Sequence, residues 1–282
     1  MILVTGAAGK TGKAIIKALA GSGYEIRALV HHKDHLPPVK LAGAREVIVG
    51  DLSDLLALKE AVRGAKSVYH ICPNVSPNEV EYGRRIIEAS QKAGVDRFVY
   101  HSVLHPQIQA MPHHWAKMRV EEIVFESGLP FTILQPAAYM QNLLAYWNDI
   151  VSGSLPIPYS ADTLLGMVDL QDVAEAAAIV ISDPKHEGAT YELAGPDRYT
   201  QGEIVEILTN MLNLPVQIEQ VPLDKWEREA LSKGLGRYQV DTLTAMFRYY
   251  DRHNFWGNSM VLGWLLGRIP TNFKAFLQGI LA

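Results

Sequence analysis

Three glycines near the N-terminus have the spacing of a dinucleotide-binding turn. They stand in the segment Gly6-Ala7-Ala8-Gly9-Lys10-Thr11-Gly12, between an apolar run and a helix-forming stretch. Glycines in such a turn allow a tight bend, let a pyrophosphate approach the backbone, and pack the helix closely on the strand. The helix N-terminus adds N–H groups and the positive end of its dipole. The sequence therefore predicts cofactor contacts from Gly6, Ala8, Gly9, Lys10, Thr11 and Gly12.

The residues after the second apolar run indicate which cofactor is preferred. NAD sites place an acidic residue there to bind the ribose 2′-hydroxyl, but this chain has His31-His32-Lys33, and Asp34 comes late. Histidine and lysine can donate to a 2′-phosphate, whereas a carboxylate would repel it. We therefore expect NADP(H) as the preferred cofactor, with NAD(H) as the alternative, and His31, His32 and Lys33 as its contacts.

Two further segments are expected to face the cofactor. Asp51-Leu52 follows the third apolar run and is placed to meet the adenine. Cys72-Pro73-Asn74 follows the fourth run, at the carboxyl edge where sheets of this kind bind ligands. Cys72 is predicted to be an inert thiol, because no basic residue adjoins it in sequence to lower its pKa.

The elements that must position these residues alternate between short apolar runs and helix-period segments. This pattern predicts an α/β protein, a doubly wound parallel-sheet Rossmann fold with a smaller C-terminal α/β substrate lobe. We expect a NAD(P)-binding domain over residues 1–150 and the lobe over 151–282, which returns to the main sheet around 165–182. The predicted strands are Ile2 to Thr5, Tyr24 to Val30, Glu46 to Val49, Ser67 to Ile71, Arg97 to His101 and Phe131 to Leu134.

Composition narrows the class of protein. The 282 residues carry a net charge of −4 and no Lys/Arg cluster, so we expect no nucleic-acid partner. No apolar stretch approaches the length of a membrane helix, and Met1 leads straight into the first strand without a signal peptide. One cysteine agrees with a reducing compartment. We expect a cytoplasmic protein with a small-molecule substrate, no membrane association, and a homodimer as an open alternative to the monomer.

Longer motifs resemble the NmrA-like branch of the atypical short-chain dehydrogenase/reductases. They are the glycine spacing, Arg97-Phe98-Val99-Tyr100-His101-Ser102, Leu134-Gln135-Pro136-Ala137-Ala138-Tyr139-Met140-Gln141-Asn142 and Tyr249-Tyr250-Asp251-Arg252-His253. In short-chain dehydrogenases a serine and a Tyr-x-x-x-Lys pair carry the chemistry. Ser102 and Lys117 match the serine and the lysine, but His113 stands where the tyrosine should be. The resemblance implies that Lys117 holds the nicotinamide ribose.

The missing tyrosine leaves three functions open. The first is an NADPH-dependent oxidoreductase that passes hydride to a small aromatic or quinone-like acceptor, because such an acceptor can take its proton from water. Lys117, His113, Ser102 and Tyr139 are then the candidate catalytic residues, and His113 or His114, with a pKa near neutrality, could donate a proton in place of the tyrosine. The second is a non-catalytic NADP(H)-binding redox sensor that acts through protein partners. The third is a relative that catalyses isomerisation or oxygenation.

A metal site is not expected, although four histidines fall within fourteen residues. Those histidines lack the spacing of a HExxH-type motif, and we expect them to lie in pockets or loops. The four are His101, His105, His113 and His114.

Overall fold

A computed structural model describes residues 1–282 and divides into two compact units. The first unit comprises residues 1–107, 113–136 and 170–191, and the second comprises 108–112, 137–169 and 192–282. Apart from residues 108–112, the second unit begins at residue 137, whereas the sequence predicted a boundary at residue 151. The chain leaves the sheet directly after its sixth strand. The return to the first unit covers 170–191, somewhat later than the expected 165–182.

A seven-stranded sheet forms the centre of the first unit and has the order β10-β6-β5-β4-β1-β2-β3. The first six strands, β1 to β6, pair in parallel, with register partners such as Ile2↔Ile26 and Ile2↔Ser67. The predicted Rossmann fold is confirmed by this order, in which the chain winds outward in both directions from β1. The strands are β1 (Ile2–Val4), β2 (Ile26–Val30), β3 (Glu46–Val49), β4 (Ser67–His70), β5 (Arg97–His101), β6 (Phe131–Pro136) and β10 (Ala189–Leu193).

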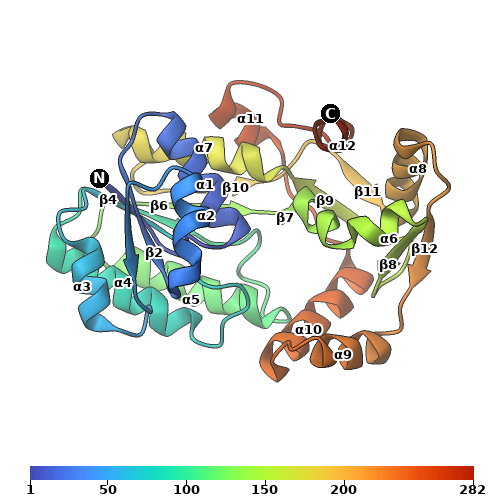
Figure 1. Cartoon of the computed structure of the whole chain (residues 1–282), viewed down its shortest axis with the longest axis horizontal. Coiled ribbons are helices and arrows are strands. Elements are labelled where there is room, and N and C mark those ends of the chain that lie inside the picture. Colours follow the sequence, from blue (N-terminus) through green and yellow to red (C-terminus); the bar gives the residue numbers. More distant parts are fainter. The chain divides into compact units, whose positions relative to one another are not determined.

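Helices cover both faces of this sheet (Figure 1). One group, α1, α2 and α7, packs together on one face, and α3, α4 and α5 lie on the other, where their apolar sides join a continuous core that includes Phe98 and Ile133. The helices are α1 (Lys10–Gly21), α2 (Leu36–Leu41), α3 (Leu55–Val62), α4 (Glu79–Ala93), α5 (Pro112–Glu126) and α7 (Leu170–Ser182), with short 3-10 turns η1 (Lys33–His35) and η3 (Pro184–His186).

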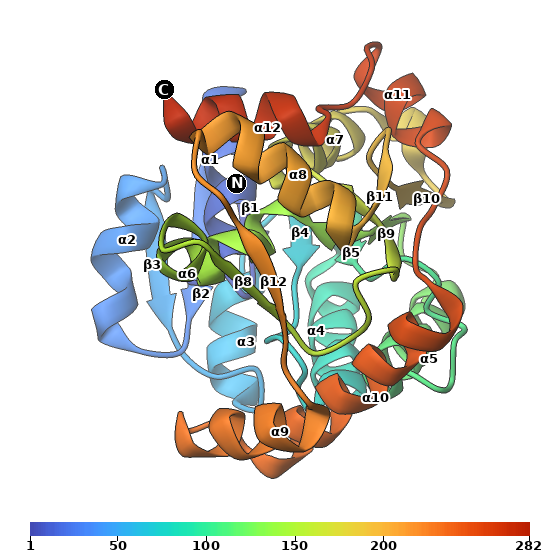
Figure 2. The ribbon, with the colours of Figure 1, turned by 90° about the vertical axis from the view of Figure 1, so that its right-hand side faces the viewer.

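The second unit has two small sheets and its own core. Its sheets have the orders β11-β9-β7 and β12-β8, and Figure 2 shows β8 and β12 side by side. Its core is centred on fully buried Phe273 with Leu208 and Ile150. The elements are β7 (Ala138–Tyr139), η2 (Met140–Tyr146), α6 (Trp147–Val151), β8 (Ser154–Ile157), β9 (Leu164–Val168), β11 (Arg198–Thr200), α8 (Gln201–Leu212), β12 (Gln217–Gln220), α9 (Leu223–Ser232), α10 (Arg237–His253), α11 (Met260–Leu266) and α12 (Phe273–Leu281).

None of these helices is long and apolar enough to cross a membrane.

The close approach of α1 to β1 depends on Gly12. A Cβ at this position would lie 2.6 Å from Ala7 Cα and 2.7 Å from Ala7 O, which is closer than atoms can pack. The obstacle is backbone, so it cannot be relieved by a side-chain rotation. Helix α1 therefore sits on its strand at a distance that only glycine permits.

We expect Gly12→Ala to lower the free energy of unfolding by about 1–3 kcal/mol, the usual cost of overpacking a core. Gly21→Ala is the matched control, because it lies in the same helix and its Cβ would meet nothing within 4 Å. The control should change stability by no more than about 1 kcal/mol. Urea denaturation followed by circular dichroism measures both, and equal stabilities for the two variants would contradict this account.

Candidate cofactor and active site

Of the three glycines in the turn, the fold requires Gly6 and Gly12 but does not require Gly9. Gly6 has a φ of +59°, and a Cβ there would lie 2.6 Å from Ile71 O, so both Gly6 and Gly12 are needed for the chain to close. Gly9 is exposed, has extended dihedrals, and its Cβ would meet only Gly6 O at 3.5 Å. The space above Gly9 is open, which fits a turn that lets a pyrophosphate approach the backbone.

The beginning of α1 fits an anion as well. Gly9 is the N-cap of α1 and offers no side-chain cap, and the first turn carries no acidic residue. Early helical N–H groups have no acceptor within the helix, so they are available to phosphate oxygens. Lys10 is exposed, and Ala8 and Thr11 are half-buried on the same turn. The turn therefore suits a dinucleotide by both shape and electrostatics.

Hydrogen bonds below the turn fix its position on the sheet. Thr5 Oγ1 donates to Ile71 O at 3.1 Å and accepts from Ile71 N at 3.0 Å, which ties the end of β1 to the end of β4. His70 Nδ1 lies 2.7 Å from the same hydroxyl. The Gly6 bend starts directly after this buried junction.

The residues expected to read the 2′-phosphate lie exposed after β2. His32 Nδ1 is 3.0 Å from Asp34 Oδ2, and His31 Nε2 is 3.4 Å from Asp51 Oδ2. Lys33 makes no ion pair and begins η1. Exposed contacts of this kind contribute little to stability, so these side chains are free to reorient toward a ligand.

The segments after β3 and β4 differ in accessibility. Leu52 is buried. Hydrogen bonds from the Ser53 hydroxyl and from Ser53 N, the latter at 2.7 Å, lower the pKa of the Asp51 carboxyl. Pro73 and Asn74 are exposed, whereas Cys72 is buried. Burial, with the Glu79 carboxylate nearby, raises the pKa of the Cys72 thiol, so the thiol stays protonated and unreactive.

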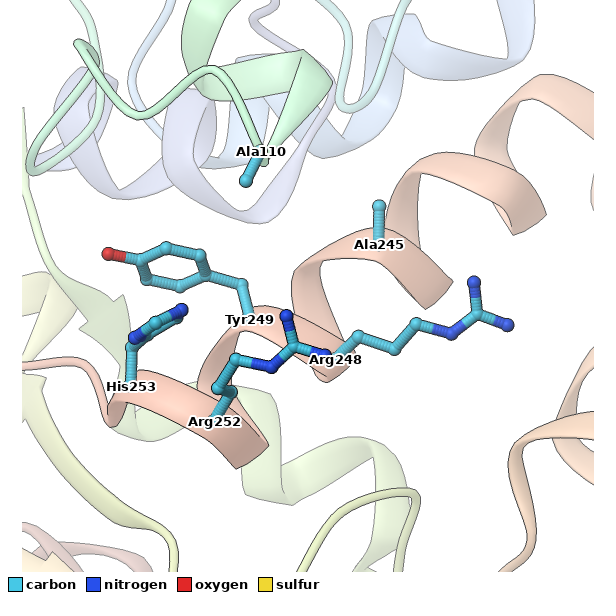
Figure 3. Close-up of a pocket in the computed structure, with 6 residues that line it drawn as sticks. All are labelled: Ala110, Ala245, Arg248, Tyr249, Arg252 and His253. Atoms are coloured by element: carbon cyan, nitrogen blue, oxygen red, sulfur yellow. The ribbon is translucent and has the colours of Figure 1, made fainter.

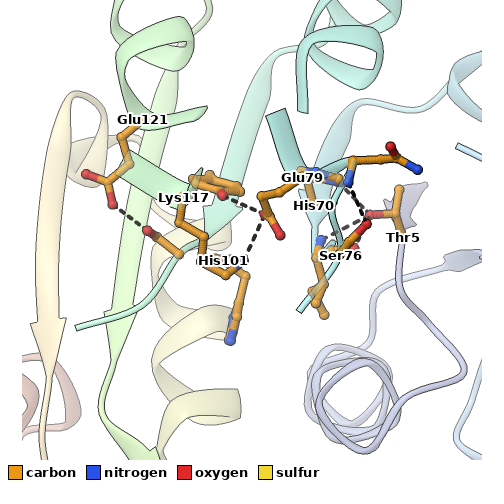
Figure 4. A network of polar contacts seen from close by, with 11 residues as sticks. Thr5, His70, Ser76, Glu79, His101, Lys117 and Glu121 are labelled. Atoms are coloured by element: carbon orange, nitrogen blue, oxygen red, sulfur yellow. Dashed lines mark hydrogen bonds and ion pairs between the residues drawn. The ribbon is translucent and has the colours of Figure 1, made fainter. Parts of the chain in front are cut away.

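A buried ion pair holds Lys117, the residue expected to bind the ribose (Figure 4). Lys117 Nζ lies 2.9 Å from Glu79 Oε1, and the side chains are only 16% and 4% exposed. Tyr100 OH donates to the same Glu79 oxygen at 2.9 Å. Lys117 Nζ also lies 3.5 Å from His101 O, at the end of β5. The ammonium is thus fixed beside the carboxyl edge of the sheet by a carboxylate from the first turn of α4.

The histidines around this cation are held in their neutral form. Burial, assisted by the charge of Lys117, lowers the pKa of both His70 and His101 to about 3. His101 Nδ1 lies 2.7 Å from Tyr69 OH. Burial and the charge of Lys117 also lower the pKa of His113 to about 4, and burial lowers the pKa of His114 to about 3. His114 Nδ1 is 3.3 Å from His105 O. Lys117 is therefore the charged member of this group at neutral pH.

The expectation of a near-neutral pKa for His113 is wrong. A buried imidazole next to an ammonium resists protonation, so His113 is a poor proton donor at neutral pH. Its Nδ1 is buried and has no hydrogen-bond partner, which leaves it able to bind a polar ligand atom. A role for His113 in orienting a substrate stays a prediction.

The hydroxyl of Ser102 is directed into the protein. It donates to Glu121 in a short contact, and Gln135 Nε2 donates to the two Glu121 oxygens at 2.9 and 3.0 Å. All three side chains are buried. Desolvation raises the pKa of Glu121. Ser102 can therefore accept a hydrogen bond from a ligand, but its proton is engaged.

Tyr139 belongs to the second unit, where β7 pairs with β9, and its catalytic role also stays a prediction.

Sequence reasoning missed Glu79, Tyr100 and Glu121. Glu121 stands four residues after Lys117, a spacing that places both on one side of α5 and could have suggested the residue. Glu79 follows the helix-capping position Asn78 and reads as an ordinary acidic residue of a first helical turn. Its burial depends on the packing of α4 against the sheet, for which the local sequence holds no signal.

Comparisons with known proteins found a matching family model and related proteins. The model of the NmrA-like family matches residues 1–273. The chain is 26% identical to an NAD(P)H azoreductase of Xenophilus azovorans over 88% of this chain and 86% of that protein. It is 26% identical to quinone oxidoreductase 2 of Escherichia coli over 96% and 95% of the two chains.

A solved structure shows the same fold over the full length. The NADPH-dependent quinone oxidoreductase of Escherichia coli, in complex with NADPH, superimposes with a TM-score of 0.86 at 25% identity and 100% coverage of both chains. A triphenylmethane reductase of Citrobacter sp. with NADP(H) superimposes with a TM-score of 0.84 at 21% identity, over 99% of each chain.

We expect Glu79→Gln to lower the free energy of unfolding by about 2–4 kcal/mol, because it leaves the Lys117 ammonium buried without a counter-charge. Glutamine retains an oxygen that can accept from Tyr100, so the loss reports the ion pair. The double variant Glu79→Gln/Lys117→Met should recover part of that loss. Glu81→Gln is the control, since Glu81 pairs with Arg85 on the exposed side of α4 and should cost less than about 1 kcal/mol.

Urea denaturation of the wild type, Glu79→Gln, Lys117→Met and the double variant forms a double-mutant cycle. Additive losses from Glu79→Gln and Lys117→Met would show that the two side chains do not interact.

Proposed function

The chain belongs to the NmrA-like family, and from this premise we propose that it is an NADPH-dependent oxidoreductase acting on a small aromatic or quinone-like acceptor. The observation that carries the proposal is the presence, at one edge of the same sheet, of an open glycine turn at Gly9 and a fixed cation at Lys117. The cofactor, when bound, supplies the hydride. The glycine turn and the beginning of α1 hold its phosphates, and Lys117 holds the ribose.

The choice of acceptor follows from what the site lacks. Reduction of a carbonyl to an alcohol needs a proton donor as well as hydride. His113 is neutral, the Ser102 proton is engaged by Glu121, and Tyr100 OH is engaged by Glu79. A quinone or azo acceptor stabilises the added electrons over a conjugated system and can take its proton from water. The azoreductase and quinone oxidoreductase relatives support this class of acceptor.

Lys117 contributes electrostatically as well. A cation beside the acceptor stabilises negative charge that develops on it, and the surrounding neutral histidines do not compete for that charge. Glu79 offsets part of the positive charge and keeps Nζ in place. Lys117 is thus the residue whose removal should affect turnover most.

The cofactor preference can be tested through Lys33→Glu. An acidic residue at this exposed position should repel the 2′-phosphate, so the Kd for NADPH should rise at least tenfold while the Kd for NADH changes less than about threefold. Fluorescence titration of each reduced cofactor measures both constants, and Lys92→Glu, at an exposed position in the last turn of α4, is the control for the change in net charge. Equal weakening of NADPH and NADH would remove Lys33 from the 2′-phosphate site.

Turnover is tested by NADPH oxidation with a panel of quinones, azo dyes and aromatic carbonyls. We expect oxidation with quinones or azo dyes, a kcat/KM at least tenfold lower in Lys117→Ala, and no cofactor binding in Gly9→Val, because a side chain on Gly9 fills the space for the phosphates. Circular dichroism of both variants checks that they fold.

The redox sensor gives a different result in the same assay. Tight NADPH binding to the wild type without oxidation by any acceptor in the panel would contradict the oxidoreductase and favour the sensor.

A further inference from the structure

The last turns of α10 line a cavity whose residues make none of the contacts described above for the cofactor site. Its volume is about 230 Å³, and it lies entirely within the second unit. Figure 3 shows the lining side chains, which come from α10 and from one residue of the 108–112 segment. They are Ala110, Ala245, Arg248, Tyr249, Arg252 and His253.

The cavity carries positive charge that the protein does not neutralise internally. None of its lining residues is acidic, although the whole chain has a net charge of −4. Arg252 makes no ion pair, and Arg248 approaches Glu227 only at 3.9 Å. Asp251, the carboxylate within this turn, instead accepts from Ser160 N at 2.8 Å. Arg248 and Arg252 are both exposed, and no carboxylate of the lining competes with an anion for them.

The helix alone does not account for this arrangement. Arg252 and His253 lie in the last turn of α10, where cations interact favourably with the helix dipole. Arg248 lies one turn earlier, and two like charges four residues apart destabilise a helix. An anion placed between Arg248 and Arg252 would remove that repulsion and could be bound by charge-assisted hydrogen bonds.

The remaining lining residues favour a flat apolar body. The rings of Tyr249 and His253 have their centroids 4.7 Å apart with an interplanar angle of 41°. Ala110 and Ala245 present only methyl groups, which leave room beside the rings (Figure 3). A cavity of about 150 Å³ is enough for a benzene molecule, so this cavity can take an aromatic ring with a substituent.

We propose that this cavity binds a small planar aromatic anion, a carboxylate or a sulfonate. Arg248 and Arg252 bind the anionic group, and the Tyr249 ring packs on the aromatic body. All residues of the site belong to the second unit, and ligand binding to it is measured without a cofactor. Its failure and the failure of the proposed function can therefore be distinguished.

The test compares 2-naphthoate with 2-naphthamide, which have nearly the same shape and differ in charge. Titration of each against the full-length protein, followed by NMR of the ligand or by its fluorescence, should give an affinity at least tenfold higher for the naphthoate. Arg252→Ala should lower the naphthoate affinity at least fivefold and leave the naphthamide unchanged. Tyr249→Ala should weaken both ligands.

Two control variants define the site. Arg228→Ala removes a cation that pairs with Asp224 on α9 outside the cavity, and Gly9→Val alters only the first unit; both should bind 2-naphthoate like the wild type. Equal affinity for the two ligands, no binding of 2-naphthoate, or an unchanged affinity in Arg252→Ala overturns the proposal. A loss of naphthoate binding in Gly9→Val would place the ligand at the phosphate turn and overturn it as well.

Discussion

The carboxylate of Glu79 is the contact on which the candidate site depends. It comes from the first turn of α4 and binds Lys117 of α5 and Tyr100 of β5 through one oxygen. Isolated, a buried carboxylate or ammonium would carry a large desolvation cost, and each offsets that cost for the other. The position of Lys117 Nζ is therefore coupled to the packing of two helices on the sheet. A flexible surface lysine could not hold a cofactor ribose with the same geometry.

Burial gives the surroundings of Lys117 a defined electrostatic character. The four imidazoles of His70, His101, His113 and His114 have lowered pKa values and stay neutral, so the positive charge near the sheet edge is concentrated on one ammonium. Such a site can stabilise negative charge on an acceptor but has little capacity to deliver a proton. This constraint underlies our proposal of hydride transfer to an electron-poor conjugated molecule, and it arises from desolvation as much as from residue type.

The sequence predicted the parts of the structure that depend on local patterns. The order and type of the elements in residues 1–136 follow from alternating apolar runs, and the glycine spacing places the turn correctly between β1 and α1. The parts that it missed depend on long-range packing. Glu79 reads as a helix-start acid, and the histidines read as near-neutral titrating groups, until the sheet and helices bury them. The point at which the chain enters the second unit also lacked a signal, because residues 137–150 continue the apolar pattern of β6 into η2.

Residues that the fold does not require are the strongest evidence for ligands. Gly6 and Gly12 are explained by contacts with Ile71 and Ala7, so they would be glycines in a protein that bound nothing. Gly9 has ordinary dihedrals and open space, and glycine at that position lowers the stability of the unliganded chain through its larger unfolded-state entropy.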